Sequence, residues 1–352
     1  MRPRMIAALL VAPLIGLALT APVAQAAPDP NLTVTAARIP RTTPVLVSSL
    51  NTVPVTVEVD AKYTWPDADP NTTLFGILER TAGSGQVNYL FTTPLKRYEG
   101  TTANGKWRGV VNVPSTANGK FELTGVMVGQ FSPGSGDMTD PTPVPGVKPT
   151  LTVTGSNQPK ITARVIPDPL PFGKGYSIRW SVINGQTGKA YGTKLRVWLA
   201  NDNGCVESFG GPVYLTDTNG YVTKAYPSSL AEYGNCLLLP GNPAPNGGLN
   251  VRPNRPGIVT AAPFETSAPV GKIVPVHGQV AGQPFGCPVH LQRLYGATAW
   301  RTVSSARVRP ASGVFTLQAQ PPYKGLIYYR VSFPACYNYR AGVSKTFTIR
   351  GT

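Results

Sequence analysis

The sequence predicts an all-β protein made of three tandem antiparallel β-sandwich domains. Three similar segments indicate this organisation, and in each a polar residue and a glycine open a run of β-branched and aromatic residues that ends at proline. They are residues 103–114 (ANGKWRGVVNVP), 218–227 (TNGYVTKAYP) and 311–321 (ASGVFTLQAQP). Glycine allows the tight turn, and the residues that follow favour a strand. The turn glycines, Gly105, Gly220 and Gly313, are 115 and 93 residues apart, which is the spacing of whole domains.

Residues 1–26 are expected to be a secretion signal. Arg2 and Arg4 form a basic start, residues 5–19 are apolar, and Ala24 and Ala26 frame a small-residue cleavage site. The apolar run is short for a membrane span, so cleavage is favoured over an uncleaved anchor. The carboxyl end, KTFTIRGT, carries no hydrophobic tail. We therefore expect a secreted, extracellular protein without a transmembrane segment after cleavage, either released or associated with the cell wall.

The rest of the chain is divided by glycine- and proline-containing turns into short strand patterns. The division predicts domains at residues 27–157, 158–257 and 258–352. Apolar and polar residues alternate within residues 53–59, 195–199 and 315–319, as in half-buried strands. The boundary near Gly257 stays open, because residues 249–252 and 258–264 can each serve as the last strand of one domain or the first of the next.

Positive charge accumulates toward the carboxyl end of a chain whose net charge is +16. Residues 27–157 hold ten basic and ten acidic side chains, residues 158–257 hold ten and five, and residues 258–352 hold ten and one. A basic terminal domain attracts anionic polymers, lipid head groups or acidic partners. Alternatively, these cations are dispersed on outward strand faces and only keep the protein soluble.

The four cysteines predict two disulfides, since an even number in an exported chain indicates oxidised pairs. Three connectivities are possible, and the simplest pairs Cys205 with Cys236 and Cys287 with Cys336, each within one domain. In the third domain the expected strands are residues 273–280, 288–294, 299–308, 314–320, 326–333 and 344–350. Cys287 begins one of two strands that are antiparallel neighbours in an immunoglobulin-type sandwich, and Cys336 follows the other. Cys336 is out of phase with the inward residues of its strand, so a bend at Pro334 is required.

A second internal similarity keeps the second and third domains in one register. Residues 188–199 (GKAYGTKLRVWL) align with residues 282–293 (GQPFGCPVHLQR). In the third domain CPVHLQRLYG, AWRTVSSARV, SGVFTLQAQP, YYRVSF and KTFTIRG follow in order. With these motifs the chain resembles the tandem immunoglobulin-like domain proteins exported by high-GC Gram-positive bacteria. The resemblance implies three immunoglobulin-like sandwiches that serve as binding or spacer modules, and it implies no catalytic residue.

Catalytic and metal sites find little support in the sequence. His277, Cys287, His290 and Cys336 have a metal-like spacing, but Cys287 and His290 point to opposite faces of one strand, which favours a disulfide over zinc. A serine hydrolase needs an orienting acid, and Glu265 is the only acid of the third domain. Paired carboxylates for glycoside hydrolysis would have to come from the mixed-charge segment of the first domain. These acids are Glu58, Asp60, Asp67, Asp69 and Glu79. We expect no enzyme, no cofactor and no metal.

Two further patterns also favour plain structural interpretations. Asp67, Asp69 and Asn71 are spaced like the start of a calcium loop, but Thr72 and Leu78 replace its glycine and glutamate, so a polar turn is expected. Arginines near Trp300 could follow a phosphate backbone, but no nucleic-acid motif accompanies them, and no nucleic acid is expected as partner. They are Arg293, Arg301, Arg307 and Arg309.

The candidate binding site is the loop after the penultimate strand of the third domain, residues 334–342. Tyr337, Asn338, Tyr339 and Arg340 have the composition of a recognition loop, since tyrosine gives contact area at low entropic cost and arginine adds charge. Tyr328 and Arg330 would extend this surface if they face outward. Alternatively, one tyrosine packs under the loop and the other covers the disulfide.

The preferred function is therefore a monomeric, surface-associated adhesion or binding module, in which the basic third domain makes contact and the others act as spacers. Its partner would be a protein, a glycan or an anionic cell-wall polymer. The alternative is a structural cell-envelope protein held by its charge to anionic wall polymers. A carbohydrate-active enzyme is a distant third.

Overall fold

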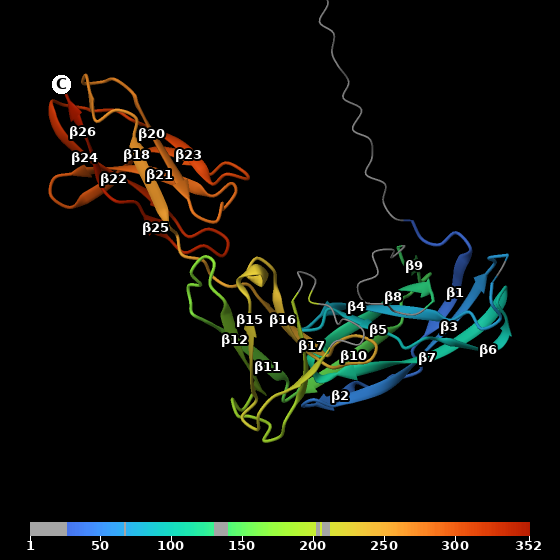
Figure 1. Cartoon of the computed structure of the whole chain (residues 1–352). Coiled ribbons are helices and arrows are strands. Elements are labelled where there is room, and N and C mark those ends of the chain that lie inside the picture. Colours follow the sequence, from blue (N-terminus) through green and yellow to red (C-terminus); the bar gives the residue numbers. More distant parts are fainter. Residues whose placement is uncertain (1–26, 67, 130–139, 202–204, 206–211) are drawn as a thin grey trace, which may run out of the picture.

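The computed structural model describes residues 27–66, 68–129, 140–201, 205 and 212–352. In this part of the chain the regular structure is strands and two short 3₁₀ turns, η1 (Ser115–Ala117) and η2 (Ser228–Leu230). The strands form six sheets, which pack in pairs as three successive sandwiches (Figure 1). The all-β, tandem immunoglobulin-like architecture expected from the sequence is confirmed. The expected signal segment, residues 1–26, lies outside the described residues.

The first sandwich pairs a sheet of order β1-β3-β7-β6 with one of order β2-β10-β8-β4-β5, to which β9 is added beside β8. All pairings are antiparallel except that of β2 with β10. The strands are β1 (Leu32–Arg38), β2 (Val45–Ser48), β3 (Thr52–Tyr63), β4 (Leu74–Ala82), β5 (Tyr89–Phe91), β6 (Lys96–Thr101), β7 (Asn104–Pro114), β8 (Gly119–Val128), β9 (Thr142–Pro143) and β10 (Thr150–Ser156). Trp107 and Phe121 are the largest side chains that this core buries completely.

The second sandwich is smaller and entirely antiparallel, with sheets of order β11-β12-β15 and β14-β13-β16-β17. Its strands are β11 (Pro159–Ile166), β12 (Tyr176–Asn184), β13 (Arg196–Ala200), β14 (Val213–Leu215), β15 (Tyr221–Tyr226), β16 (Asn235–Leu239) and β17 (Gly247–Val251). Trp180 is fully buried at its centre, with Tyr176 and Tyr226 stacked at one end.

The third sandwich has sheets of order β18-β20-β23 and β19-β26-β24-β21-β22, with β25 beside β24 and a parallel contact between β19 and β26. Its strands are β18 (Val259–Pro263), β19 (Ser267–Ala268), β20 (Val274–Val280), β21 (Pro288–Tyr295), β22 (Ala299–Arg307), β23 (Val314–Ala319), β24 (Gly325–Phe333), β25 (Gly342–Val343) and β26 (Phe347–Gly351). The six strands expected from the sequence all appear, within three residues of their expected ends. The short or edge strands β18, β19 and β25 complete the sandwich.

The three similar sequence segments occupy the same place in each sandwich. They lead into β7, β15 and β23, and each of these strands pairs with the long central strand of its sheet, β3, β12 or β20. Gly220 and Gly313 have the positive φ that a tight turn requires. Gly105 differs from the expectation, because it already pairs within the sheet and the positive φ falls on Gly100 across the hairpin. The repeat therefore identifies equivalent strands, although the turns differ.

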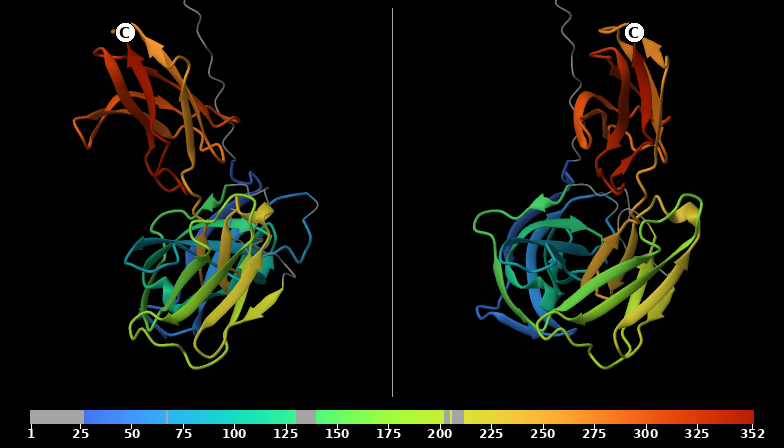
Figure 2. Two further views of the ribbon diagram at one scale, coloured as in Figure 1. Left: turned by 60° about the vertical axis from the view of Figure 1, so that its left-hand side comes forward. Right: turned by 90° about the vertical axis from the view of Figure 1, so that its left-hand side faces the viewer.

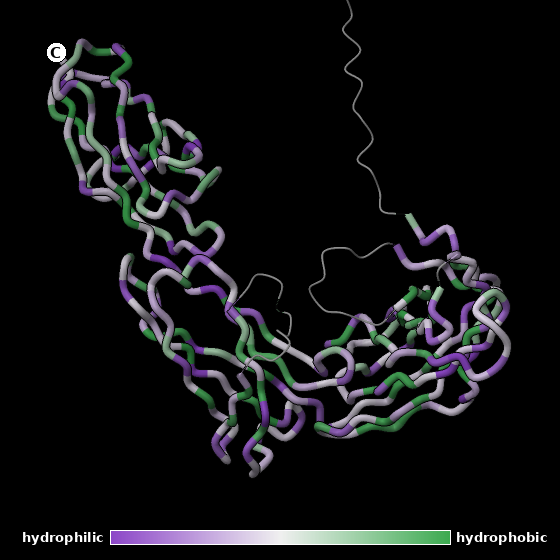
Figure 3. The backbone as a smooth tube through the Cα atoms, turned by 45° about the vertical axis from the view of Figure 1, so that its right-hand side comes forward, coloured by the Kyte–Doolittle hydropathy of each residue, from purple (hydrophilic) through white to green (hydrophobic). Residues whose placement is uncertain are grey.

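Alternating sequence patterns become the buried faces of the sheets. Along β3, Val55, Val57 and Val59 are buried, and along β23 the buried residues are Phe315, Leu317 and Ala319. Figure 3 shows hydrophobic and hydrophilic positions interspersed along the backbone. Because successive side chains of a strand point to opposite faces, this alternation fixes which face is buried.

The joint between the first two sandwiches is made by direct hydrogen bonds. Gln86 Nε2 donates to the carbonyl of Pro159 at 2.8 Å, Asn112 Nδ2 donates to that of Asn242 at 3.0 Å, and the Thr116 hydroxyl donates to that of Asn246. In addition, Leu50 of the first sandwich packs against the core of the second. Polar bonds and apolar packing together hold these two sandwiches side by side.

The joint between the second and third sandwiches is organised around Arg255. Its side chain is only 3 % exposed, and its Nη2 donates to Glu232 Oε1 at 2.6 Å while its guanidinium lies over the Phe172 ring at 5.2 Å. Its backbone N–H donates to the Asn338 carbonyl at 2.7 Å, and its carbonyl accepts from the Arg340 N–H at 2.8 Å. Gly257 and Gly342 pass so close together that a Cβ on Gly342 would lie 1.6 Å from the Gly257 carbonyl oxygen. The linker is thus packed against the third sandwich.

The third sandwich extends away from the first, with the carboxyl terminus at its far end (Figures 1 and 2). The sheets change from the first to the second sandwich between Ser156 and Pro159, and from the second to the third between Val251 and Val259. On this basis we propose domain boundaries near residues 157 and 257. Strand β17 is the last of the second sandwich and β18 the first of the third, which answers the question left open by the sequence. Among the described residues no helix has the length and apolarity needed to span a membrane.

Candidate functional site

The loop expected to bind a partner lies at the second joint. Tyr339 is only 7 % exposed, donates its hydroxyl hydrogen to the Gly282 carbonyl at 2.6 Å and contacts the ring of Phe172 from the second sandwich. Burial raises the pKa of Tyr339 above its ordinary value. Asn338 Nδ2 donates to the Pro253 carbonyl at 2.9 Å, and Arg340 Nη2 donates to Asp168 Oδ2 at 2.7 Å. Three of the four candidate side chains therefore make contacts within the chain.

Tyr337 is the member of this loop that faces solvent, with 83 % of its surface exposed and a positive φ of 52°. The structure does not bring the four side chains together as one recognition surface. Ligand binding by this loop stays a prediction, and it now depends on Tyr337. The composition of the loop suggested a recognition site, but tyrosine, asparagine and arginine serve equally well in a contact between two domains of one chain.

Both expected disulfides are present. Cys205 is bonded to Cys236, and Cys287 is bonded to Cys336. Cys287 precedes β21 and Cys336 follows β24, and these two strands are antiparallel neighbours. The chain leaves the strand geometry at Pro334, which brings Cys336 back toward the core, as the phase of the sequence required. The second disulfide thus ties the joint loop to the buried face of the third sandwich.

The two histidines lie on different sheets. His290, on β21, contacts the Ser305 hydroxyl through Nδ1 at 2.8 Å, whereas His277, on β20, packs edge-on against Phe264. Among the described residues no group of three histidine, cysteine or acidic side chains converges as a metal site would require. Asp69 caps a turn by accepting the Asn71 N–H at 2.7 Å, and Asp67 lies outside the described residues.

Two of the carboxylates considered for glycoside hydrolysis, Glu58 and Asp60, are bound to arginines on the outer face of the first sandwich. Glu58 accepts from Arg38 and Arg108, and Asp60 accepts from Arg38 at 2.8 Å. Hydrogen bonding to Asp60 is the main reason that the pKa of Arg38 lies above its ordinary value. These acids form a cross-strand ion-pair network, which is a structural arrangement for an exposed sheet face.

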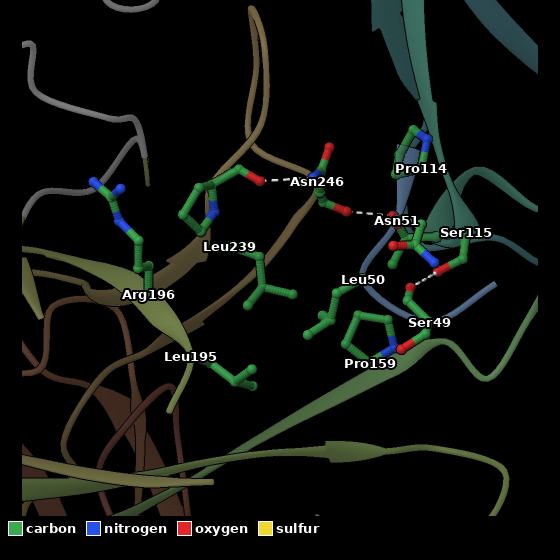
Figure 4. Close-up of a pocket in the computed structure, with 12 residues that line it drawn as sticks. Ser49, Leu50, Asn51, Pro114, Ser115, Pro159, Leu195, Arg196, Leu239 and Asn246 are labelled. Atoms are coloured by element: carbon green, nitrogen blue, oxygen red, sulfur yellow. Dashed lines mark hydrogen bonds between the residues drawn. The ribbon is translucent and has the colours of Figure 1, made fainter. Parts of the chain in front are cut away.

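A crevice of about 200 Å³ lies at the first joint (Figure 4). Leu50, Leu195 and Leu239 form its apolar wall, and Arg196 lies at one side. Two of its polar side chains are occupied within the chain, because Ser115 donates to the Ser49 carbonyl and Asn246 donates to the Pro240 carbonyl. The residues that line it include no histidine, cysteine or carboxylate. Its lining can therefore pack an apolar group but offers no acid–base pair.

A second feature is an arginine pair on the β21–β22 hairpin of the third sandwich, formed by Arg293 and Arg301. The two residues are direct cross-strand partners. Their guanidinium carbons lie 4.3 and 4.9 Å from the centre of the Tyr295 ring, and Arg293 also donates a hydrogen bond to the Tyr295 hydroxyl. Like charges directly opposite each other in a sheet repel, and the cation–π contacts of both arginines with the Tyr295 ring offset part of this repulsion.

The arginine pair lies at the end of the sandwich away from the joint. Arg293 is six residues along the strand from Cys287, which corresponds to about 20 Å. Arg293 is the cross-strand partner of Tyr329, and burial is the main reason that the pKa of Tyr329 is raised. Tyr323, 52 % exposed, lies in the turn before β24 at the same end of the sandwich. The structure separates the arginine group considered from the sequence, because Arg307 lies at the opposite end of β22 and donates to the Gly286 carbonyl at 2.8 Å.

On the outer face of the same hairpin Arg330 lies 4.4 Å from the centre of the Trp300 ring and donates to Gln292 Oε1 at 2.8 Å. Tyr328 is exposed beside it on β24. Tyr328 and Arg330 face outward, but they lie at the far end of the sandwich and do not extend the joint loop.

Most cations of the third sandwich have no acidic partner in the part of the chain that the structure describes. Among the described residues, Lys272 forms an ion pair with Glu265 and Arg340 forms one with Asp168. The other eight lysines and arginines of residues 258–352 form no ion pair with a described carboxylate, since Glu265 is the only acid of this segment. The positive charge read from the sequence therefore remains available on the surface.

Sequence reasoning missed the partners of the joint, above all Arg255 and Phe172. Their roles depend on how two domains meet, and a local pattern does not carry that information. A cationic residue, Arg255, close to the expected domain boundary was the only available signal.

Comparison with known proteins identifies no family. The sequence matches no protein-family description and no curated protein. Among solved structures, the chain is similar to FdeC, a broadly conserved Escherichia coli adhesin described as eliciting protection against urinary tract infections. The two are 11 % identical over 90 % of this chain and 96 % of the other, with a TM-score of 0.27. A likeness at that TM-score has no weight in assigning a function.

Proposed function

We propose that this protein is a secreted adhesion or binding module that acts through its third sandwich and performs no catalysis. The first two sandwiches act as a spacer, and the monomer presents its basic end to a cell surface or extracellular polymer. The resemblance to proteins exported by high-GC Gram-positive bacteria belongs to the same proposal. The observation that carries it is the basic, acid-poor third sandwich, in which eight cations lack a described acidic partner.

The joints support this proposal. A terminal domain is useful as a contact unit when its orientation is restricted, because less freedom is then lost on binding. Arg255, Tyr339 and Arg340 restrict the third sandwich relative to the second, and the hydrogen bonds at the first joint restrict the second relative to the first.

A second candidate function is that of a structural envelope protein held by charge to anionic wall polymers, and the same excess of cations favours it. The two functions predict a different effect of salt on attachment to the envelope. Purely electrostatic attachment is released by salt, whereas a specific contact that includes buried apolar surface is retained in part.

The test is the retention of the full chain on isolated cell envelopes and on envelopes stripped of anionic polymers. We expect retention at low salt and partial retention at physiological ionic strength. Complete release by moderate salt would favour the structural alternative. No retention on either preparation would contradict both functions.

The joint loop is tested separately by Tyr337→Ala, since Tyr337 is exposed and its removal leaves the joint intact. Weaker retention would support a contribution of this loop. Unchanged retention would show that residues 334–342 do not contribute to binding. The contact would then lie at the far end of the third sandwich.

A further inference from the structure

We infer that the arginine pair, Arg293 and Arg301, is a binding site for the carboxylate groups of an acidic polysaccharide. This inference rests on the proposed function and names its ligand class and residues. The site consists of two cross-strand guanidinium groups that both contact one tyrosine ring at the free end of the third sandwich.

The geometry favours an anionic group. A guanidinium that lies over a ring directs its N–H groups outward around its edge, and a carboxylate accepts two of them in parallel. The stacked side chains are already restricted, so little side-chain entropy remains to be lost on binding. The one acid of the third sandwich, Glu265, is bound to Lys272 at 2.8 Å, so no acid of this sandwich competes for the site.

The repulsion between the two arginines also favours an anionic ligand. Two arginines directly opposite each other repel, and neither forms an ion pair with a described carboxylate. An anion that contacts both guanidinium groups would offset the repulsion and gain two charge-assisted contacts. Lys324, next to Tyr323 at the same end, adds a further cation with no described acidic partner.

An exposed aromatic ring distinguishes a sugar polymer from other polyanions. Tyr323, in the turn before β24 at this end of the sandwich, is 52 % exposed. The apolar face of a sugar ring can pack on such a ring, which removes apolar surface from water. A polymer that carries both carboxylates and sugar rings matches both parts of this surface.

The experiment measures binding of the full chain to an oligogalacturonate by calorimetric titration at low ionic strength. Poly-L-glutamate, with carboxylates but no sugar, inorganic polyphosphate and a neutral xylo-oligosaccharide are the comparison probes. We expect the oligogalacturonate to bind most tightly and the neutral sugar not to bind. Equal binding of all three polyanions would overturn the assignment to a polysaccharide, and so would preference for polyphosphate.

The variant is Arg293→Gln with Arg301→Gln, and the expected loss of affinity for the oligogalacturonate is about tenfold or more. Its matched control is Arg164→Gln with Arg179→Gln in the second sandwich. These arginines are also direct cross-strand partners, and Arg179 lies 4.0 Å from the centre of the Tyr221 ring. Both variants remove the same charge from the same kind of hairpin.

Equal losses in the two variants would mean general charge attraction and would overturn the site. An unchanged affinity in the Arg293/Arg301 variant would do so too, provided that its unfolding transition matches that of the parent. If the full chain stays on cell envelopes but fails to bind the oligogalacturonate, only this inference is wrong. If it is not retained on envelopes, the proposed function fails as well.

Discussion

At the scale of single residues, two tyrosines two positions apart have different roles. Tyr337 is exposed, while Tyr339 is buried between the third sandwich and Phe172 and donates to the Gly282 carbonyl. The distinction follows from the turn, in which Cys336 and Tyr339 exchange backbone hydrogen bonds and Tyr337 is placed at the outside.

Tyr339→Ala should lower the free energy of unfolding of the third sandwich by about 3 kcal/mol, because it leaves a cavity and an unpaired carbonyl. Tyr337→Ala should change it by less than about 0.5 kcal/mol. Denaturant unfolding followed by a probe in the third sandwich measures both. Similar losses in the two variants would contradict the assigned burial.

Tyr226 makes the second sandwich sensitive to high pH. Burial raises the pKa of Tyr226 well above its ordinary value of about 10. Folding favours the neutral form of Tyr226, and the resulting stabilisation is fully present below about pH 10. It is lost as the pH rises from about 10 up to the raised pKa of the folded state.

We therefore expect Tyr226→Phe to reduce the fall in unfolding free energy between pH 8 and pH 11 by about 1 kcal/mol, because pH 11 lies about one pH unit above the pKa of tyrosine in the unfolded chain. The exposed Tyr233→Phe is the control. Parallel pH profiles for the parent and Tyr226→Phe would show that other groups cause the alkaline loss.

At the scale of elements, each disulfide acts within one sandwich. Cys205 and Cys236 are separated by 31 residues, and Cys287 and Cys336 by 49. Closing loops of these lengths stabilises the folded state by about 4 kcal/mol each in the chain-entropy description.

Replacing Cys287 and Cys336 by serine should lower the unfolding midpoint of the third sandwich and leave the second unchanged, since distant sites act independently. The Cys205 and Cys236 double variant should do the reverse. Thiol labelling of the denatured, unreduced parent should find no more than a trace of reactive thiol. A substantial thiol signal would contradict both disulfides.

At the scale of the whole molecule, the second joint sets the direction of the basic end. Arg255 connects the linker, Glu232 and Phe172, and its side chain is almost completely buried. An arginine at this position acts through packing as well as charge.

Arg255→Met should broaden the distribution of distances between labels on the first and third sandwiches, while the unfolding midpoint of the first sandwich stays unchanged. Pulsed electron-spin distance measurements would record this change. Arg309→Met, at an exposed position of the third sandwich, removes the same charge and should leave the distribution narrow. Equal distributions in all three proteins would show that the orientation does not depend on Arg255.

Agreement between sequence and structure is best where the relevant interactions are local. The alternation in β3 and β23, the equivalent placement of β7, β15 and β23, and the two cysteine pairs could be predicted because strand periodicity and turn chemistry act over a few residues. The aligned glycines Gly188, Gly192, Gly282 and Gly286 all have positive φ, so they keep one register in two sandwiches.

The sequence by itself thus determined an all-β chain of repeated sandwiches with disulfides and an increasingly basic carboxyl end. Only the tertiary structure decided where the candidate side chains lie. It placed Asn338, Tyr339 and Arg340 in a joint and brought Arg293 and Arg301 onto one ring at the free end. The physical reason is that these contacts join segments far apart in the chain, and the packing of whole sheets and domains, not local periodicity, selects which of them form.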